Sequence, residues 1–216
     1  MKVYHLPFEV RALVFDMDLT LYTNAEYGQY QVDCLVERLG KLRGLSFEEM
    51  NLEMEAARKA WALSHNGKRP SLSNLLLQYG ITMEDNVRWR EECCEPEKFI
   101  KEDARLKESL EILSRSYILG VVTNNPVLVA RKTLAALGVE AYFPILIGLD
   151  TCMTPKPHKT PFMKFSELSG CPPEACVSIG DRYDIDLDIP LGLGMGGILV
   201  DGVQDVYSLP NTVFTR

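Results

Sequence analysis

Short apolar runs separated by amphipathic stretches recur along the first and last parts of the chain. The runs are rich in Val, Ile, Leu and Phe, as in the buried strands of parallel sheets. They predict strands at residues 12–15, 117–122, 143–148, 176–179 and 197–200. Helical stretches alternate with them at residues 106–113, 126–137, 161–168 and 185–193, the last interrupted by Pro190. This alternation predicts an α/β fold: a Rossmann-like parallel sheet with right-handed crossovers and helices on both faces.

The segment between the first two predicted strands has a different texture. From residue 24 to residue 103 it is charged, has helical periodicity and lacks buried-strand runs. Ser46-Phe47-Glu48-Glu49 has the capping-box pattern that opens a helix, and Gly40 is expected to end the helix before it. We therefore predict an all-helical cap at residues 22–103. It is inserted after the first strand of an α/β core formed by residues 1–21 and 104–216.

The first predicted strand ends abruptly in acidic residues. Asp16 follows the run Ala12–Phe15, and Asp18 and Thr20 follow at alternate positions. Carboxylates at the end of a buried strand indicate a site, because ligands of open α/β sheets bind in the crevice there. One carboxylate can attack as a nucleophile while the other transfers a proton, and together they suit a hard cation. The alternative is a strand-end Asp that caps a turn.

Two further segments carry side chains suited to an anion. Thr123 and Asn124 follow the strand at 117–122 and precede a predicted helix N-terminus, where free N–H groups favour anions. We expect both to face a ligand while Asn125 caps the helix. Lys156 lies between two prolines that restrict its backbone, and it can neutralise both a phosphate and a carboxylate. The plainer alternative for Lys156 is a solvated loop lysine.

The strand at 176–179 leads into a stretch with four acids in eight positions: Asp181, Asp184, Asp186 and Asp188. Gly180 before them is expected to allow a sharp turn at the strand end. So many carboxylates repel one another without a counter-ion, although some can cap the following helix. Asp181, nearest the strand end, is the best candidate metal ligand.

Composition narrows the class of protein. The chain has 216 residues and a formal charge of −7, which argues against a general nucleic-acid binder. The N-terminus lacks the apolar core of a signal peptide, and no apolar run approaches the length of a membrane span. The six cysteines include no C-x-x-C pair, so we expect reduced thiols and a cytoplasmic location. Any anion site in this acidic chain must be locally positive or loaded with metal.

Taken together, these stretches resemble the four motifs of the haloacid dehalogenase superfamily in its phosphatase form. The string Phe15-Asp16-Met17-Asp18-Leu19-Thr20-Leu21-Tyr22 resembles the first motif, and Thr123 resembles the threonine or serine of the second. Lys156, in a Lys-Pro-x-x-x-Pro-Phe context, resembles the third. Gly180-Asp181 with Asp186 resembles the fourth. The helical insert resembles the α-helical cap of that family.

The resemblance implies roles for these residues. Asp16 would form an aspartyl-phosphate, and Asp18 would act as general acid and then general base. The phosphoryl oxygens would be held by Thr123, Asn124 and Lys156.

The resemblance also implies Mg²⁺ as the cofactor. Its ligands would be Asp16, the main-chain carbonyl of Asp18, and Asp181, with Asp186 ordering the outer shell. Asp184 lies one place short of an alternative spacing of the fourth motif, so only a supporting role is assigned to it.

We therefore expect an Mg²⁺-dependent phosphatase acting on a small phosphorylated metabolite such as a sugar phosphate, phosphoglycolate or a nucleotide. Asp18 disfavours the dehalogenase branch, which lacks an acid at that position. A β-phosphoglucomutase-like phosphomutase shares every motif, and a non-catalytic binding protein is the other alternative. Substrate selection is expected in the cap, where the basic loop 65–70 either binds an anionic leaving group or simply connects two helices.

Overall fold

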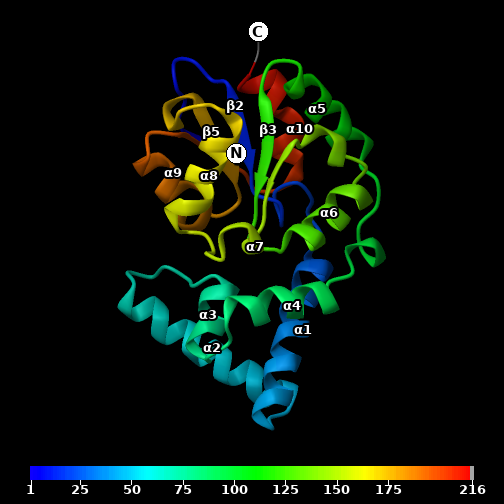
Figure 1. The fold of residues 1–216 in the computed structure, drawn as a ribbon, viewed down its shortest axis with the longest axis vertical. Helices are drawn as coiled ribbons and strands as arrows, with labels where there is room; N and C mark the ends of the chain where they lie inside the picture. The colour runs from blue at the N-terminus through cyan, green and yellow to red at the C-terminus, as the bar shows by residue number, and fades with distance from the viewer. Residues whose placement is uncertain (215–216) are drawn as a thin grey trace.

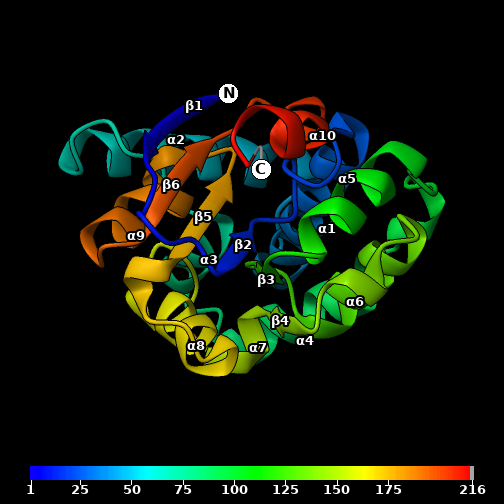
Figure 2. The same ribbon diagram turned by 90° about the horizontal axis from the view of Figure 1, so that it is seen from above.

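The computed structural model describes residues 1–214 and contains a six-stranded sheet. The strands lie in the order β1-β6-β5-β2-β3-β4 (Figure 2). Each pair of neighbouring strands from β6 to β4 runs parallel, which confirms the predicted parallel α/β fold. The bounds are β1 Lys2–His5, β2 Ala12–Phe15, β3 Ile118–Val122, β4 Ile145–Ile147, β5 Cys176–Gly180 and β6 Gly196–Leu199.

The hydrophobic pattern gave no sign of the edge strand β1, which pairs antiparallel with β6. All four of its residues are exposed, so it contains no buried apolar run. An edge strand needs none, because part of it faces solvent. The sheet is therefore not wholly parallel. The helical insert follows β2, which is the first strand that the sequence predicted, as expected.

The register at the centre of the sheet aligns three strand ends. Phe15 of β2 pairs with Ile179 of β5 on one side and with Val121 of β3 on the other. The main-chain N–H of Asp16 also donates to the Ile179 carbonyl at 2.8 Å, so the pairing extends one residue past β2. The residues that follow β2, β3 and β5 consequently emerge together at one edge of the sheet.

Alternating side chains of β2 divide the core between the two faces of the sheet. Leu13 and Phe15 belong to a cluster lined by α5, α6 and α10, whereas Ala12 and Val14 pack with Phe165 of α8. Figure 2 shows α10 and α8 on opposite sides of the sheet. The helices are α5 Ala104–Ser114, α6 Val127–Ala136, α7 Leu149–Cys152, α8 Lys159–Ser169, α9 Asp188–Gly192 and α10 Val203–Thr212. Single turns are η1 Pro96–Lys98, η2 Glu140–Tyr142, η3 Pro173–Ala175 and η4 Tyr183–Leu187.

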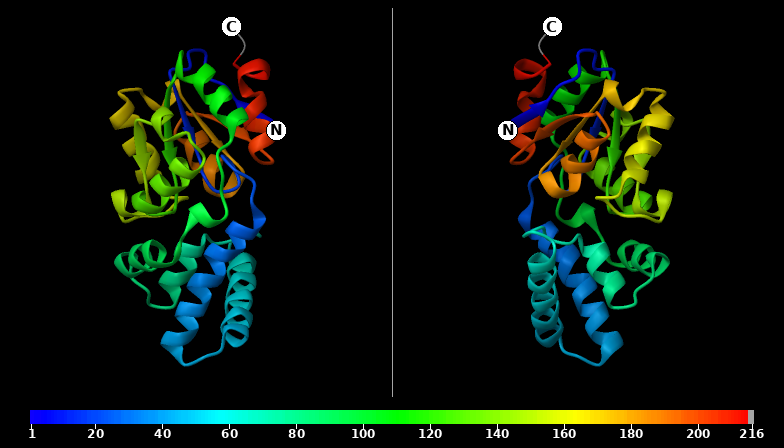
Figure 3. Two further views of the ribbon diagram at one scale, coloured as in Figure 1. Left: turned by 90° about the vertical axis from the view of Figure 1, so that its right-hand side faces the viewer. Right: turned by 90° about the vertical axis from the view of Figure 1, so that its left-hand side faces the viewer.

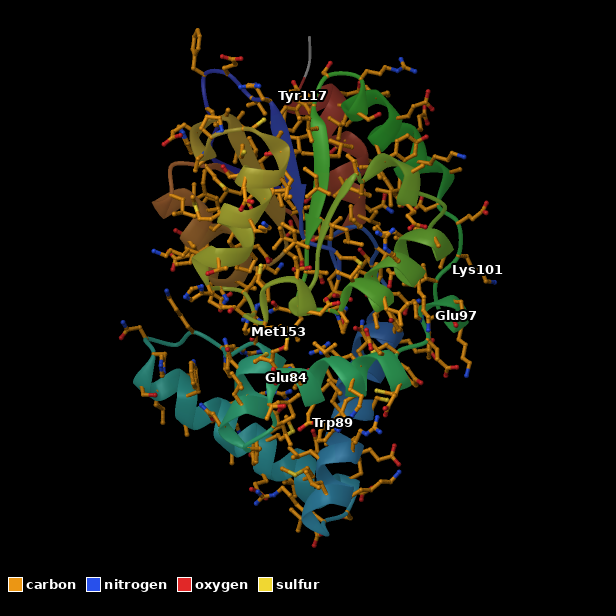
Figure 4. All side chains as sticks on the ribbon, viewed as in Figure 1. Glu84, Trp89, Glu97, Lys101, Tyr117 and Met153 are labelled. Atoms are coloured by element: carbon orange, nitrogen blue, oxygen red, sulfur yellow. The ribbon has the colours of Figure 1, made fainter. Side chains whose placement is uncertain are left out.

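Four helices form a second lobe, which lies below α7 and the sheet in Figures 1 and 3. They enclose their own hydrophobic cluster, to which Leu35, Met50, Leu75 and Trp89 contribute from the four helices in turn. Figure 4 shows Trp89 on the side of α4 that faces away from the sheet. The division at residues 22 and 103 stays a prediction. The bounds are α1 Ala25–Arg43, α2 Phe47–Ser64, α3 Leu72–Gln78 and α4 Met83–Cys93.

The turn between α1 and α2 partly follows the expectation. Ser46 Oγ accepts the Glu49 N–H at 3.2 Å, and Glu49 Oε2 accepts the Ser46 N–H at 2.8 Å, so the predicted capping box is confirmed. The expected helix end at Gly40 is wrong, because α1 continues to Arg43 and is ended by Gly44, whose φ is 72°. Gly40 instead allows close packing: a Cβ there would lie 3.0 Å from the Leu45 carbonyl oxygen.

Across residues 1–214, none of the helices combines the length and the apolar character needed to cross a bilayer.

Candidate active site

Asp16 leaves the end of β2 and meets Lys156, which comes from the loop after α7. The Lys156 ammonium lies 2.5 Å from Asp16 Oδ1 and 2.7 Å from Asp186 Oδ1. Lys156 is only 2% exposed, so its charge lies inside the protein. The solvated-loop alternative for Lys156 is therefore wrong.

The side chain of Asn124 holds the main chain of Lys156. Its Oδ1 accepts the Lys156 N–H at 2.7 Å, and its Nδ2 donates to the Lys156 carbonyl at 3.2 Å. Both ends of the amide are thus used to fix the loop that carries the lysine. The main-chain N–H of Asn124, by contrast, donates to no group within residues 1–214.

Three carboxylates converge around this lysine. Oxygens of Asp16, Asp181 and Asp186 lie within 4.8 Å of one another. Three negative charges and the one ammonium leave the group with a formal charge of −2. Carboxylate oxygens are the ligands that hard cations prefer, and a divalent ion would cancel this charge. The residues present therefore fit a divalent cation.

Burial perturbs the protonation of the group. It raises the pKa of Asp16, a rise that Lys156 opposes and Asp186 reinforces. It raises the pKa of Asp181 to about 6, and Asp186 adds to that rise. Burial alone would lower the pKa of Lys156, but the carboxylates of Asp16 and Asp186 outweigh this effect and raise the pKa of the lysine. One ammonium is thus too little positive charge for three ionised carboxylates.

Asp186 reaches the cluster from η4, a π-helical turn after β5. Its Oδ2 accepts the Arg182 N–H at 3.0 Å, and its carbonyl accepts from Ser178 Oγ at 2.7 Å. The sharp turn expected at Gly180 is wrong, because this residue lies in β5 without a left-handed φ. Gly180 provides space instead, since a Cβ there would lie 2.4 Å from Asp186 Cβ.

The other two acids of this stretch point elsewhere. Asp184 pairs with Arg182 at 2.8 Å, and Asp188 pairs with Lys68 of the helical lobe at 2.7 Å. Arg182 also donates to the Arg69 carbonyl at 3.0 Å. These contacts attach the loop 65–70 to the sheet lobe beside Asp181.

A cleft of about 800 Å³ opens beside that loop, lined by the helical lobe and, from the sheet lobe, by Arg182. Its lining includes four cationic side chains, those of Arg58, Lys59, Arg69 and Arg182. Two of the four pair with acids, whereas Lys59 and Arg69 form no ion pair within residues 1–214. The basic loop therefore helps to line a cleft in which four cations outnumber the one acidic residue, Glu55.

Neutral donors surround the carboxylate of Asp18. Tyr22 donates its hydroxyl to Oδ1, and Gln31 Nε2 of α1 donates to the same oxygen at 2.9 Å. Asn125 Nδ2 donates to Oδ2 at 2.8 Å. Burial raises the pKa of Tyr22 and Asp18 adds to that rise, so the hydroxyl keeps the proton that it donates.

The expectation that Asn125 caps α6 is wrong. Pro126 precedes the helix without a side-chain cap, and the Val127 N–H donates to Asp150 Oδ1 at 2.8 Å. Asn125 Oδ1 accepts instead from Arg90 Nη1 of α4, also at 2.8 Å. No sequence motif signals this pairing, because Arg90 lies in the middle of a helix in the other lobe.

Two threonines lie beside these groups. Thr123 is buried at the end of β3, and its Oγ1 accepts the Asn125 N–H at 3.1 Å. Thr20 is also buried and donates a long bond of 3.5 Å to Asp16 Oδ2. Leu19 before it has a φ of 61°, a conformation that is costly for leucine and that turns the chain back toward Asp16.

The model of the haloacid dehalogenase-like hydrolase family matches residues 13–195. The chain belongs to this family. The matched region contains all the residues placed around Asp16 and Asp18, and the resemblance drawn from the four motifs is confirmed.

Known members resemble this chain over most of its length. A phosphoglycolate phosphatase of Aquifex aeolicus is 27% identical over 197 residues, which are 87% of this chain and 82% of the relative. A HAD phosphatase of Thermococcus onnurineus shares the fold with a TM-score of 0.59 and 21% identity, over 88% of this chain and 86% of that one. A putative HAD hydrolase of Bacillus subtilis, solved with magnesium, also has a TM-score of 0.59, at 18% identity and coverages of 94% and 99%.

Replacing Asp181 with Asn is expected to raise the melting temperature of the metal-free protein above about pH 6. The pKa of Asp181 is raised from 3.8 to about 6, so the cost of its ionised form grows from about pH 4 and is complete above about pH 6; the gain is therefore smaller at pH 5 than at pH 8. The same variant is expected to lose the increase in melting temperature that Mg²⁺ gives by binding the folded state. Scanning fluorimetry at pH 5 and pH 8, with and without Mg²⁺, measures both effects.

Asp184→Asn is the matched control for that experiment, because its carboxylate pairs with Arg182 outside the cluster. It should keep the Mg²⁺ effect. An Mg²⁺ effect of full size in Asp181→Asn would contradict a cation site at this cluster.

Gly180→Ala is expected to destabilise the protein by roughly 1–3 kcal/mol, since the added methyl overlaps Asp186 and must displace it. Urea unfolding measures the change. Gly192→Ala is the control, because a Cβ at that position meets nothing within 4 Å. Equal stability of the two variants would show that Gly180 is not needed for space.

Proposed function

We propose that this chain is an Mg²⁺-dependent phosphatase that hydrolyses a small phosphate monoester through an aspartyl-phosphate on Asp16. The observation that carries the proposal is the meeting of Asp16, Lys156, Asp181 and Asp186 at one edge of the sheet. Phosphoryl transfer needs an aligned nucleophile and positive charge around the phosphoryl group more than any other assistance. The similarity to the phosphoglycolate phosphatase of Aquifex aeolicus supports the same class of reaction.

Asp16 and Asp18 carry the two halves of the proposed reaction. A carboxylate oxygen of Asp16 attacks phosphorus as the bond from phosphorus to the leaving oxygen breaks, and Asp18 gives its proton to that oxygen. Asp18 then takes a proton from water, whose oxygen attacks phosphorus and breaks the bond to Asp16. Inorganic phosphate and an alcohol are released, and both carboxyl groups return to their starting forms.

Three donors hold the phosphoryl oxygens in this proposal. They are the Thr123 hydroxyl, the main-chain N–H of Asn124 and the ammonium of Lys156. The Asn124 N–H is supported by its lack of an acceptor within residues 1–214. The side chain of Asn124 contributes indirectly, because it fixes the main chain of Lys156.

Mg²⁺ would be held by Asp16, the main-chain carbonyl of Asp18, and Asp181. When bound there it would neutralise negative charge on the phosphoryl group. Asp186 has a supporting role, because its two carboxylate oxygens already accept from Lys156 and Arg182. Magnesium in the Bacillus subtilis structure of the same fold supports this choice of metal.

The cleft beside loop 65–70 supports a substrate with a second negative charge. Its cationic lining would attract a carboxylate or phosphate on the leaving group, although the chain as a whole is acidic. Phosphoglycolate carries such a carboxylate and is the first compound to test.

The six free thiols support the expected cytoplasmic location.

The purified protein is expected to release phosphate from p-nitrophenyl phosphate in the presence of Mg²⁺. EDTA should abolish the activity, and Asp16→Asn should lower it by roughly 10³-fold or more, because it removes the nucleophile. A phosphate-release assay measures both. Hydrolysis that persists after either treatment would refute the mechanism.

Two further assays on the same purified protein distinguish a phosphatase from a phosphomutase and from a non-catalytic binding protein. A phosphomutase would convert glucose 1-phosphate to glucose 6-phosphate without releasing phosphate. A non-catalytic binding protein would bind Mg²⁺ with a phosphate analogue in calorimetry yet turn over neither compound.

Arg69→Gln is expected to lower kcat/KM for phosphoglycolate by roughly tenfold and to leave its uncharged methyl ester unaffected. The reason is the loss of one charge-assisted contact to the leaving group, about 1.4 kcal/mol. Steady-state kinetics on the two compounds measures the difference. Arg115→Gln, which removes an exposed charge at the end of α5 outside the cleft, is the control. Equal effects on the two compounds would contradict an anion site in the cleft.

A further inference from the structure

A closed set of hydrogen bonds links Asp18 to the helical lobe. Asn125 Nδ2 donates to Asp18 Oδ2 at 2.8 Å and to Gln31 Oε1 at 2.9 Å. Gln31 Nε2 donates to Asp18 Oδ1 at 2.9 Å and to the Tyr22 hydroxyl at 3.2 Å. Tyr22 in turn donates to Asp18 Oδ1. Asn125 and Gln31 therefore each support a neighbouring donor as well as the carboxylate, whereas Tyr22 donates to the carboxylate alone.

The orientation of every amide in this set follows from Arg90. A guanidinium can only donate, so the oxygen of Asn125 must face Arg90 Nη1, 2.8 Å away. The nitrogen of Asn125 is then left for Asp18 and for the oxygen of Gln31. This in turn leaves the nitrogen of Gln31 for Asp18 and Tyr22. Turning either amide over would place two donors or two acceptors against each other.

Arg90 is an expensive residue in this position. It is only 6% exposed, and its guanidinium donates to the amide oxygens of Asn86 and Asn125 rather than to a carboxylate. Its Nε donates to Asn86 Oδ1 at 2.9 Å, and that leaves the buried Nδ2 of Asn86 without a partner in the part of the chain described. The buried guanidinium has neutral partners, and the amide of Asn86 is left unsatisfied, so each lowers the stability of the fold. Apolar side chains at positions 86 and 90 would avoid both costs.

We propose that Arg90 is a positioning residue for Asp18, acting through Asn125 and Gln31 to hold the carboxyl group in line with the leaving oxygen. The proposal rests on the proposed function, in which Asp18 protonates that oxygen. Arg90 and Gln31 come from α4 and α1, whereas Asp18 and Asn125 follow strands of the sheet. Placement of the proton donor therefore depends on how the helical lobe sits on the sheet lobe.

The dependence of the rate on the leaving group tests this role. A strongly basic alkoxide needs a proton as it leaves, whereas p-nitrophenolate does not. Arg90→Met is therefore expected to lower kcat/KM for phosphoglycolate by roughly 10- to 100-fold, part of the usual contribution of general acid catalysis. Its effect on kcat/KM for p-nitrophenyl phosphate should stay within about threefold, because kcat/KM reports formation of the aspartyl-phosphate, and p-nitrophenolate leaves in that step without a general acid. Gln31→Met, which removes a donor without changing length much, should show the same selectivity.

Three further variants calibrate the measurement. Asp18→Asn sets the full loss of the acid on each compound. Arg90→Lys retains a donor-only group and should recover part of the phosphoglycolate activity. Arg88→Met removes an exposed guanidinium from the same helix, where it pairs with Asp85, and should leave both rates unchanged.

The outcomes are distinct. An equal loss on both compounds in Arg90→Met and Gln31→Met, with selective loss in Asp18→Asn, would overturn the positioning role and leave the proposed function intact. Failure of the unsubstituted protein to hydrolyse either compound would overturn the proposed function. A crystal structure of Arg90→Met supplies a readout that needs no activity. The Asn125 amide and the Asp18 side chain should turn away from their present partners, and unchanged positions of both would also overturn the proposal.

Discussion

The structure depends on one electrostatic constraint: a single buried ammonium is shared among three carboxylates. Lys156 contacts Asp16 and Asp186 directly, and Asp181 completes the group. Buried carboxylates of this density are stable only with nearby positive charge, which is why Lys156 is clamped at both ends of its main chain by Asn124. The remaining charge of −2 is the property that suits the site to a divalent ion. The excess of negative charge that destabilises the metal-free group is therefore also what suits the group to bind a cation.

A second constraint joins the two lobes, through contacts of two different kinds. Lys68 and Asp188 form an ion pair that is half open to solvent, and such pairs contribute only about 0–1 kcal/mol. The contacts of Arg90 and Gln31 with Asn125 and Asp18 are buried and include charged partners. Movement of the helical lobe would break the first contact at little cost, whereas the second would resist it. The buried link is therefore the contact that ties Asp18 to the helical lobe.

Much of the fold and of the candidate site could be predicted from the sequence, because the apolar runs of the central strands signal burial and the polar residues after them indicate the edge where ligands bind. The edge strand β1 could not, since it has no buried run. Contacts between distant segments are equally hidden, because no local spacing encodes them. Gln31 and Arg90 reach Asn125 from other helices, so in the sequence Asn125 resembles an ordinary helix cap. The four acids after β5 likewise separate into two groups only once their cationic partners are placed.

The distribution of positive charge explains how an acidic chain can present a site for anions. Exposed charges more than about 8–10 Å apart are largely screened at physiological ionic strength, so the net charge of −7 says little about the potential inside a cleft. Lys156 contacts Asp16, and a separate group of cations lines the cleft beside loop 65–70. Positive charge is thus concentrated at two places in a chain that is acidic as a whole. Under the proposed function, a second negative charge on the leaving group would be attracted to the cleft, whereas a neutral leaving group would gain nothing there.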